Sequence, residues 1–276
     1  MSNQFWRHLS RENFQRRFGV KRKTFQQMVK AVKSQSGTQI KRGKKAKLCV
    51  EEQILVTLEY WREYRTYFHI GTSWGVSEST VCRIVHRIEN QLMASGKFRL
   101  QGKKSLLRGF SRPKIAVMDV TETPIERPKR KQRQYYSGKK KHHTLKSQLI
   151  INRETGEIIC TFFGKGRSHD FSVFKASGVH FDSGTMSLAD SGYQGINQYH
   201  DNSYTPRKKP QNGELSTLEK EYNRLLAKER IIIEHINRRL KIFKILGNRY
   251  RNRRRRYGLR CNLLAAIYNY ELTLSA

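Results

Sequence analysis

The chain has 276 residues, of which 37% are hydrophobic, and this length and composition suit two modest globular domains. Its 56 Lys and Arg residues stand against only 22 Asp and Glu residues, and the formal net charge of +34 indicates a polyanionic partner. The cations are spread over the whole chain and no long apolar run occurs, which favours nucleic acid over a membrane surface as that partner.

The cysteines and the first residues bear on the cellular compartment. Cys49, Cys82, Cys160 and Cys261 are far apart and show no pairing or zinc-binding pattern. The opening MSNQFWRHLSREN has no apolar signal core. We therefore expect a protein of a reducing compartment, the cytoplasm, without a structural zinc site.

Residues 1 to 47 begin with short amphipathic stretches and end in a basic run. The apolar positions of these stretches are Phe14, Phe18, Phe25, Met28 and Val29. The run IKRGKKAK, at residues 40–47, is typical of a linker or of an arm that touches DNA.

Residues 51–93 carry the pattern of a helix-turn-helix. A first helix is predicted from Glu51 to Arg65 and a second from Tyr67 to Trp74, after which Gly75 breaks the pattern. Ser77 can cap a third helix. The inner positions of the first and third helices are apolar at helical spacing, namely Ile54, Leu55, Leu58 and Trp61, then Val81, Ile84, Val85, Ile88 and Leu92.

The third of these helices would present a polar face to the edges of DNA bases. Ser79, Cys82, Arg83 and His86 lie opposite its apolar stripe when the residues are placed at helical spacing. An ordinary three-helix bundle with a solvated face would show the same pattern. The interpretation as a DNA reader therefore rests on the strongly basic character of the chain.

After Leu107 the sequence changes to the two-residue period of strands. The predicted order is β-β-β-α-β-α-β-α, with the first helix at residues 168–177. Pro206 limits the fifth strand to an edge. A long helix is predicted from Ser216, which can form a capping box with Glu219. The predicted strands cover residues 114–120, 146–152, 157–163, 185–190 and 203–209.

Two aspartates follow apolar strands and point to chemistry. Asp119 shares a strand face with Ile115 and Val117, where an unpaired charge would be costly. Asp190 ends another strand, just before the turn SGYQG, so the two carboxylates can converge at one edge of a sheet. A divalent metal ion would satisfy both. Either aspartate alone could instead cap a loop at the end of its strand.

A third acidic residue, Glu234, lies in the long helix. The predicted core-facing stripe of this helix consists of Ile232, Ile236, Leu240 and Phe243. Arg230 and Lys241 are spaced so that they share one line with Glu234, where they could steady phosphates beside a metal ion. The solvated face of an amphipathic helix would look identical, so periodicity leaves both interpretations open.

Together, the segments MDVTETPI, LADSGYQG and RIIIEHINRRLK resemble the three catalytic segments of DDE transposases with a ribonuclease-H-like core. The groups concerned are bacterial insertion-sequence transposases and the related Harbinger-like superfamily. Their third segment follows the pattern Y-x2-R-x3-E-x6-K, and this chain supplies Arg230, Glu234 and Lys241 in register but has Ala227 where Tyr is usual. The resemblance covers residues 51–270 and includes the segment KGRSHDFSVFK.

The resemblance implies an α+β protein with a helical DNA-binding region at residues 1–104, whose helix-turn-helix lies at about 51–93. A ribonuclease-H-like α/β catalytic domain with a mixed five-stranded sheet would follow at residues 105–276. The implied ligands of two Mg²⁺ ions, for which Mn²⁺ could substitute, are Asp119, Asp190 and Glu234. Ser79, Arg83, His86, Arg230 and Lys241 are the residues expected to contact DNA.

The implied activity is metal-dependent cleavage at transposon ends followed by strand transfer into target DNA. The partner would be double-stranded DNA at a prokaryotic nucleoid, and the synapsis of two ends would need a homodimer or a higher oligomer. Three alternatives remain open at this point. They are a domesticated and inactive transposase that regulates through DNA binding, a related nuclease without strand transfer, and a basic RNA-binding protein.

Three further features carry weaker signals. The segment 127–146 contains nine Lys or Arg residues and is expected to form a DNA-gripping hairpin or loop around Tyr135 and Tyr136. His169 and Asp170 are expected to cap a helix near the catalytic edge of the sheet. The run RYRNRRRR at residues 249–256 is expected to contact phosphates.

Overall fold

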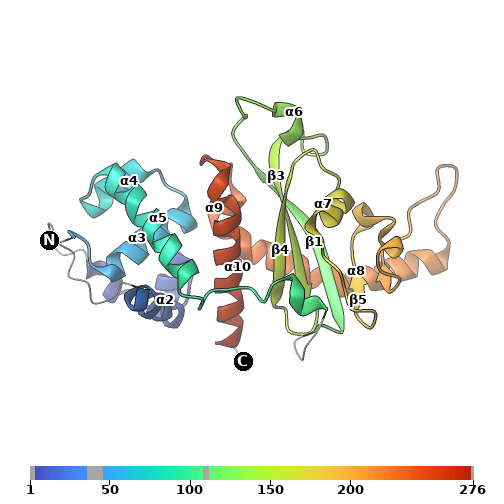
Figure 1. Ribbon diagram of the computed structural model, residues 1–276, viewed down its shortest axis with the longest axis horizontal. Helices are drawn as coiled ribbons and strands as arrows, with labels where there is room; N and C mark the ends of the chain where they lie inside the picture. The colour runs from blue at the N-terminus through green and yellow to red at the C-terminus, as the bar shows by residue number, and fades with distance from the viewer. Residues whose placement is uncertain (1–3, 36–45, 108–111, 275–276) are drawn as a thin grey trace. The chain divides into compact units, whose positions relative to one another are not determined.

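A computed structural model describes residues 4–35, 46–107 and 112–274, and the chain falls into two compact units (Figure 1). Unit 1 comprises Met1–Arg99, Leu240–Asn248 and Arg254–Ala276. Unit 2 comprises Leu100–Arg239 and Arg249–Arg253. Most of the predicted basic arm, residues 40–45, lies outside the described residues.

Unit 1 is helical. The predicted amphipathic stretches near its start form α1 and α2, and their Phe14, Phe18 and Met28 side chains are fully buried. The α-helices of this unit are α1 (Arg11–Phe18), α2 (Arg22–Gln35), α3 (Val50–Glu63), α4 (Tyr67–Trp74), α5 (Glu78–Ala94), α9 (Lys244–Gly247) and α10 (Tyr257–Thr273), with 3₁₀ turns η1 (Gln4–Arg7) and η5 (Arg254–Arg256).

The predicted helix-turn-helix is confirmed by α3, α4 and α5. Gly75 ends α4 in the left-handed conformation, with φ of 64°, which glycine adopts without a side-chain penalty. The Ser77 hydroxyl then accepts a hydrogen bond from the Thr80 amide at 3.3 Å and caps α5. All five apolar residues predicted for the inner face of α5 are buried.

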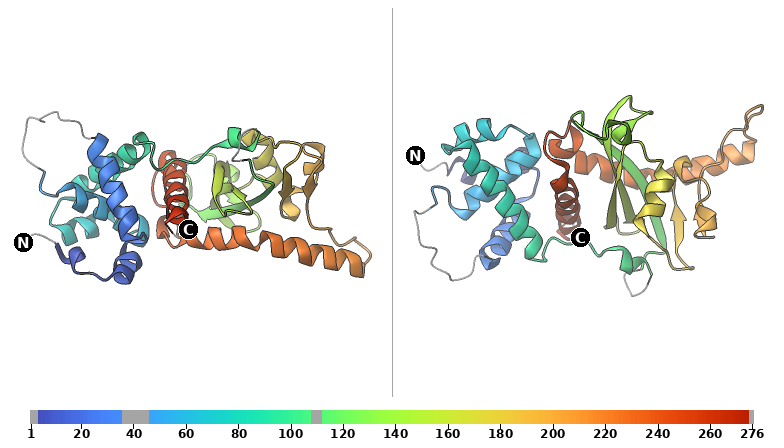
Figure 2. Two further views of the ribbon diagram at one scale, coloured as in Figure 1. Left: turned by 90° about the horizontal axis from the view of Figure 1, so that it is seen from below. Right: turned by 45° about the horizontal axis from the view of Figure 1, so that its top comes forward.

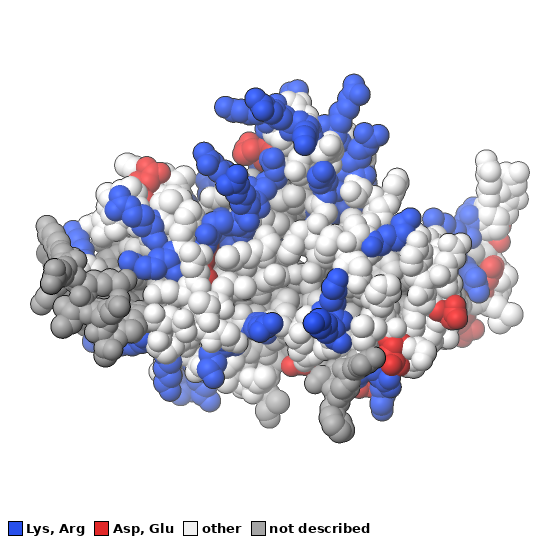
Figure 3. Space-filling model, in the orientation of Figure 1, with Lys and Arg blue, Asp and Glu red and all other residues white. Residues whose placement is uncertain are grey.

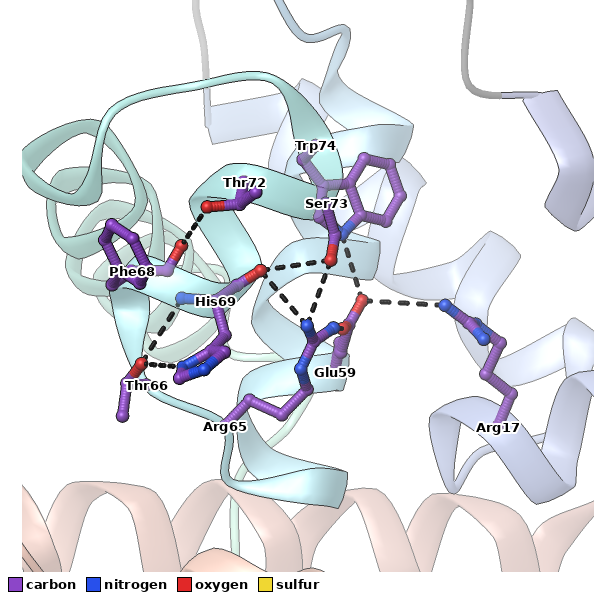
Figure 4. Close-up of polar contacts among 9 residues, drawn as sticks. All are labelled: Arg17, Glu59, Arg65, Thr66, Phe68, His69, Thr72, Ser73 and Trp74. Atoms are coloured by element: carbon purple, nitrogen blue, oxygen red, sulfur yellow. Dashed lines mark hydrogen bonds and ion pairs between the residues drawn. The ribbon is translucent and has the colours of Figure 1, made fainter.

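A buried carboxylate fixes the angle between the helices of this motif (Figure 4). Glu59 on α3 is 3% exposed and accepts hydrogen bonds from the Trp74 indole at 2.9 Å and from Arg65 at 2.6 Å. Arg65 also donates to the carbonyl of His69 at 3.1 Å and to the Ser73 hydroxyl at 3.0 Å. The end of α3 is thereby tied to the whole length of α4, which sets how α5 is presented.

The C-terminal helix α10 packs with the N-terminal helices. Its Arg260 is fully buried and donates to Glu89 of α5 at 2.6 Å, while Arg256, which precedes α10, reaches the other Glu89 oxygen at 2.7 Å. Glu271 near the end of α10 accepts the Lys21 amide at 2.6 Å. The two compact units thus differ from the predicted domains, residues 1–104 and 105–276, because α10 belongs to unit 1. The predicted domain boundary stays a prediction. The difference arises because Glu89 is buried and needs cations that only α10 and its approach supply.

Unit 2 is built on a mixed sheet. Five of its strands are ordered β4-β3-β1-β5-β6, and β2 pairs with the beginning of β3. The pairs β4-β3 and β3-β1 are antiparallel, and the pairs β1-β5 and β5-β6 are parallel. The strands are β1 (Ile115–Pro124), β2 (Tyr136–Ser137), β3 (His142–Asn152), β4 (Ile158–Lys165), β5 (Met186–Leu188) and β6 (Ser203–Tyr204).

Helices cover both faces of this sheet, with α7 and α8 on opposite sides (Figure 2). On the α7 side, the core includes Met118, Ile150 and Phe174. Alternation along β1 therefore turns Asp119 toward α8. The helices and turns of unit 2 are η2 (Lys103–Leu106), α6 (Gln132–Tyr135), α7 (Asp170–Ser177), η3 (Ser191–Tyr193), η4 (Ile196–Gln198) and most of α8 (Thr217–Lys241).

The predicted fold class is confirmed: a helical N-terminal region precedes a mixed α/β sheet, and the chain is α+β overall. The predicted fifth strand is shorter than expected and ends at Tyr204, ahead of Pro206, which has no amide hydrogen for a ladder. The helix expected between the fourth and fifth predicted strands consists of the two 3₁₀ turns η3 and η4.

The predicted start of the long helix is confirmed. The Ser216 amide donates to the Glu219 carboxylate at 2.9 Å, and the Glu219 amide donates to the Ser216 hydroxyl at 3.2 Å, which makes the reciprocal capping box. Within residues 4–35, 46–107 and 112–274, every helix is too short or too polar to cross a bilayer.

Candidate active site and DNA-binding surface

Asp119 and Asp190 occupy equivalent places on neighbouring parallel strands. Val117 of β1 pairs with Leu188 of β5, and each aspartate stands two residues further along its chain. The two aspartates consequently lie at the same level of adjacent strands. The prediction that Asp119 ends its strand is wrong, because pairing with β3 extends β1 to Pro124, while Asp190 follows the end of β5. The Asp190 carboxylate also accepts the Gly192 amide at 2.9 Å and so caps the turn η3.

The electrostatics of this edge favour a cation. Burial raises the pKa of the Asp119 carboxyl, and the negative charge of Asp190 raises that pKa further, while Arg230 opposes the shift. The fully buried Tyr193 has its pKa raised by burial and by the neighbouring carboxylates, so its hydroxyl stays neutral. Two ionised aspartates in such a setting repel each other unless a positive charge lies between or beside them.

A third carboxylate, Asp170, closes the same edge. A Cβ atom on Gly192 would lie 2.9 Å from an Asp170 oxygen and 3.0 Å from an Asp190 oxygen, so both side chains crowd this glycine. Lys146 on β3 is 7% exposed and bonds to Asp170 at 2.6 Å, with a Glu122 oxygen at 3.8 Å. The buried ammonium neutralises Asp170, which leaves Asp119 and Asp190 as the carboxylates at this edge without a Lys partner of their own.

The expected cap at His169 and Asp170 is found in part. His169 does occupy the N-cap position of α7, but its side chain makes no capping hydrogen bond, and Asp170 is drawn to Lys146 instead. A full ammonium charge at 2.6 Å outcompetes a backbone amide as partner for a carboxylate. The expected position near the catalytic edge is where Asp170 lies.

The helix α8 brings Arg230 to the site but holds Glu234 at its rim. Arg230 is half-buried and acts on the pKa values of Asp119 and Tyr193. Glu234 is exposed, and it forms no hydrogen bond or ion pair within the part of the chain that the structure describes. Lys241, the last residue of α8, is also exposed. The inward stripe of α8 contains Ile233, Ile236 and Leu240, while Ile232, predicted for this stripe, is only half-buried.

A residue outside the predicted set makes the closest contact with Asp119. The Asn237 amide nitrogen of α8 donates to an Asp119 oxygen at 2.9 Å. Asn237 lies seven residues after Arg230 and therefore on the same line of the helix, which is a signal that the sequence does contain.

The residues at this edge suit a hard divalent cation. Carboxylate oxygens are donors that Mg²⁺ takes from proteins, and Asp119 and Asp190 supply them here. Among the described residues no cluster of three or more His, Cys, Asp or Glu side chains is gathered closely enough to hold an ion, and the side chain of Glu234 is exposed.

The residues expected to read DNA differ in exposure. Ser79 and Arg83 are exposed on one face of α5, where Arg83 donates to the Ser79 hydroxyl at 3.4 Å. His86 is half-buried, and Arg256 donates to its carbonyl at 3.3 Å. Burial, and then the positive charge of Arg256, lower the pKa of His86, so its ring is neutral at neutral pH. Ser79 and Arg83 are thus the more accessible of the three.

The segment 127–146 forms the expected basic hairpin, from α6 through β2 into β3. Figure 3 shows Lys and Arg side chains gathered over α6 and the adjoining end of β3. The hairpin is anchored to β4, because Lys165 donates to the Gln134 side chain at 2.8 Å. Tyr136, which pairs with His143, is 42% exposed. The exposed cations of this hairpin are Arg127, Lys129, Arg130, Lys131, Arg133, Lys139, Lys140 and Lys141.

Family models match both parts of the chain. Residues 118–269 match the model of the DDE superfamily endonuclease. Residues 46–98 match the model of the helix-turn-helix of the DDE superfamily endonuclease, which covers α3, α4 and α5.

Two relatives match over most of their length. A protein of Microchaete diplosiphon, described as a probable transposase for insertion sequence element IS702, is 55% identical over 270 residues, 98% of each chain. A protein of Streptomyces albus G, described as a candidate transposase for insertion sequence element IS112, is 24% identical over 232 residues, 83% of each chain. No solved structure matches the chain.

Proposed function

Because the chain belongs to the DDE superfamily endonucleases, we propose that it is the transposase of a prokaryotic insertion sequence, cutting the ends of its element and joining them to target DNA. The observation that carries this proposal is the 55% identity, over 98% of both chains, to a relative described as an insertion-sequence transposase. The convergence of Asp119 and Asp190 at one edge of the sheet supports it independently.

The family implies dependence on a divalent metal, and we assign Asp119, Asp190 and Glu234 as its ligands and Mg²⁺ as the ion. Bound there, Mg²⁺ would activate the attacking oxygen and stabilise the leaving one. Glu234 has to turn inward from its exposed position, which an exposed side chain without an ion pair can do at little cost. Arg230, beside Asp119, offers its guanidinium to the phosphate that reacts.

Two displacement reactions of one kind make up the proposed cycle. Water first breaks a phosphodiester bond at the end of the element and leaves a 3′ hydroxyl. That hydroxyl then attacks a phosphodiester of the target, so that one bond forms as another breaks and the element becomes joined. Since both reactions have the same chemistry, one set of carboxylates serves both, and no covalent bond to the protein is needed.

DNA recognition is assigned to α5 of the helix-turn-helix and to the cations of the basic hairpin. Ser79, Arg83 and His86 are proposed to face base edges, and Arg230 and Lys241 to contact the DNA backbone near the site. Joining two ends of one element requires two active sites, so we propose that a homodimer or larger oligomer acts at the nucleoid.

The test uses labelled duplexes that carry the inverted repeats flanking the gene, together with target DNA and Mg²⁺. We expect nicked ends and joined products, and loss of both when a chelator removes the metal ion. Nicks without joined products would support the nuclease, binding without nicks would support the inactive regulator, and preference for structured RNA would support the RNA-binding protein. Each of these three results would overturn the proposal.

Arg83 offers a test of the reading helix. Arg83→Ala should reduce the preference for an end duplex over a random duplex by about 1 to 3 kcal/mol, because an exposed Arg on α5 can donate two hydrogen bonds to one base. Competition binding at fixed salt measures this preference. Lys30→Ala, which removes an exposed charge from α2, should weaken both duplexes alike. Unchanged discrimination by the Arg83 variant would exclude Arg83 as a reader.

A further inference from the structure

We propose that Asn237 is a positioning residue of the active site, which orients the Asp119 carboxylate toward the divalent cation. The inference rests on the proposed function for the role of Asp119, and it adds a residue to the three acidic residues assigned to the site. Its basis is the direct hydrogen bond from the Asn237 amide to Asp119 at 2.9 Å.

The position of Asn237 on α8 makes this contact a fixed one. Asn237 is 9% exposed and lies next to the buried Ile236, and its hydrogen bond to Asp119 places it on the face of α8 that meets the sheet. The helix has already begun twenty residues earlier, at Thr217, so its backbone is well established here. A side chain held in this way has little freedom, and its hydrogen bond selects one orientation of the Asp119 carboxylate.

The Asp119 carboxylate receives a second hydrogen bond from the protein. Asn237 donates to Oδ2, and the Val120 amide also donates to the carboxylate, so two hydrogen bonds from the protein orient it beside Asp190. A hydrogen bond to a charged acceptor is stronger than one between neutral groups, and it compensates part of the loss of water around the buried carboxylate. Asp119 can thus remain ionised, the form that a hard cation requires.

The oxygen of the Asn237 side-chain amide also points to a ligand at this site. The Asn237 Oδ1 atom is buried and has no hydrogen-bond partner within the described part of the chain. An acceptor left in this state costs free energy, and a leucine of similar size would fill the space without that cost. A purely structural role therefore does not account for an amide here, whereas a water molecule or hydroxyl group brought in with the cation would satisfy the orphan oxygen.

Loss of this positioning contact should weaken metal binding. Removal of a group that orients a metal ligand typically costs 10- to 100-fold in affinity or activity. We expect Asn237→Leu to raise the Kd for Mn²⁺ at least about tenfold. In cleavage assays the Mg²⁺ concentration for half-maximal rate should rise by a similar factor, and most of the rate should return at saturating Mg²⁺.

The experiment compares Asn237→Leu with Asn223→Leu in the full-length protein. Asn223 lies on the same helix and bonds only to the backbone of Arg207, so its variant controls for the loss of an Asn amide from α8. Mn²⁺ is titrated calorimetrically into each protein, free and bound to an end duplex, and thermal melting monitors the fold. Asn237→Ser, which keeps a small polar group, provides the second variant if the leucine protein does not fold, and it should show the same direction of change.

The expected result is a weaker Mn²⁺ affinity for the Asn237 variants alone. Mn²⁺ binding within twofold of the wild type in the Asn237 variants, or an equal loss in Asn223→Leu, would overturn the inference. If Asn237→Leu weakens Mn²⁺ binding but the wild-type protein never joins DNA, the proposed function is contradicted and the role of Asn237 stands. If the wild-type protein joins DNA but the Asn237 variants bind Mn²⁺ as the wild type does, the role of Asn237 is contradicted and the proposed function stands.

Discussion

Asp119→Asn, Asp190→Asn and Glu234→Gln should each reduce DNA cleavage and joining to background, while the variants stay folded and still bind the end duplex. The amide keeps the size of each side chain but removes the charge that a hard divalent cation needs. Both reactions should fail together, since the same carboxylates are assigned to each. Labelled end duplexes, scored for nicked and for joined products, measure the two reactions separately.

Metal-free stability provides a second readout for Asp119. Its folded-state pKa is raised, so the carboxyl begins to destabilise the fold as the pH rises through the ordinary pKa of an aspartate, and the penalty is complete above the folded-state pKa. At neutral pH Asp119→Asn removes this penalty, and its melting temperature without metal should equal or exceed that of the wild type. An inactive Asp119 variant with a lowered melting temperature would point to damage of the fold instead of loss of a ligand.

Glu234 is the most informative of the three positions because it is exposed and lies outside the described carboxylate cluster. Glu221→Gln, an exposed acid on the same helix, is its matched control and should cleave at the wild-type rate. If the folded Glu234→Gln protein cleaves as fast as this control, the three-carboxylate assignment fails and the site must be built from Asp119, Asp190 and another donor.

Glu89→Gln should lower the free energy of unfolding by about 3 to 5 kcal/mol, the usual effect of removing one member of a buried ion pair. Glu89 is completely buried and accepts hydrogen bonds from Arg260 at 2.6 Å and from the Trp61 indole at 3.1 Å. Without its charge, the guanidinium of Arg260 stays buried with no anion to balance it. Urea unfolding of the full-length protein, followed by circular dichroism, measures the change.

Two comparisons separate this charge effect from a loss of packing. Glu78→Gln, at an exposed position on α5, should change the stability by well under 1 kcal/mol. The double variant Glu89→Leu with Arg260→Leu removes both charges and should recover most of the stability that the single variant loses, because a buried pair is often replaceable by apolar side chains. A single variant as stable as the wild type would show that the Glu89 charge is not needed.

Local features of the fold could be predicted from the sequence because short-range physics sets them. The helix-turn-helix follows from apolar spacing, from Gly75 and from the Ser77 cap, all within a few residues of each other. The start of α8 follows in the same way from Ser216 and Glu219. The convergence of Asp119 and Asp190 could be predicted as well, since each follows an apolar run that forms a strand of one sheet.

Contacts between distant residues could not be predicted in this way. Arg260 and Glu89 are 171 positions apart, and neither helix reveals in its own spacing that it will bury a charge against the other. The residues around Asp170 predict a helix that it could cap. Its carboxylate instead binds Lys146, which comes from β3 and is distant in the sequence. Asn237 shares a helical line with Arg230, yet only the register of α8 on the sheet decides that it reaches Asp119 and Glu234 does not.

The packing of α10 against the N-terminal helices also determines when the protein can work during its synthesis. The ribosome produces the helix-turn-helix early. Arg256 and Arg260, which donate hydrogen bonds to Glu89 in α5, are translated only after the whole of unit 2. The unit that carries α5 is therefore completed after the sheet that carries Asp119 and Asp190. A chain that stops short of residue 256 lacks both arginines that donate to Glu89, so we expect its N-terminal helices to be less stable than those of the full-length protein.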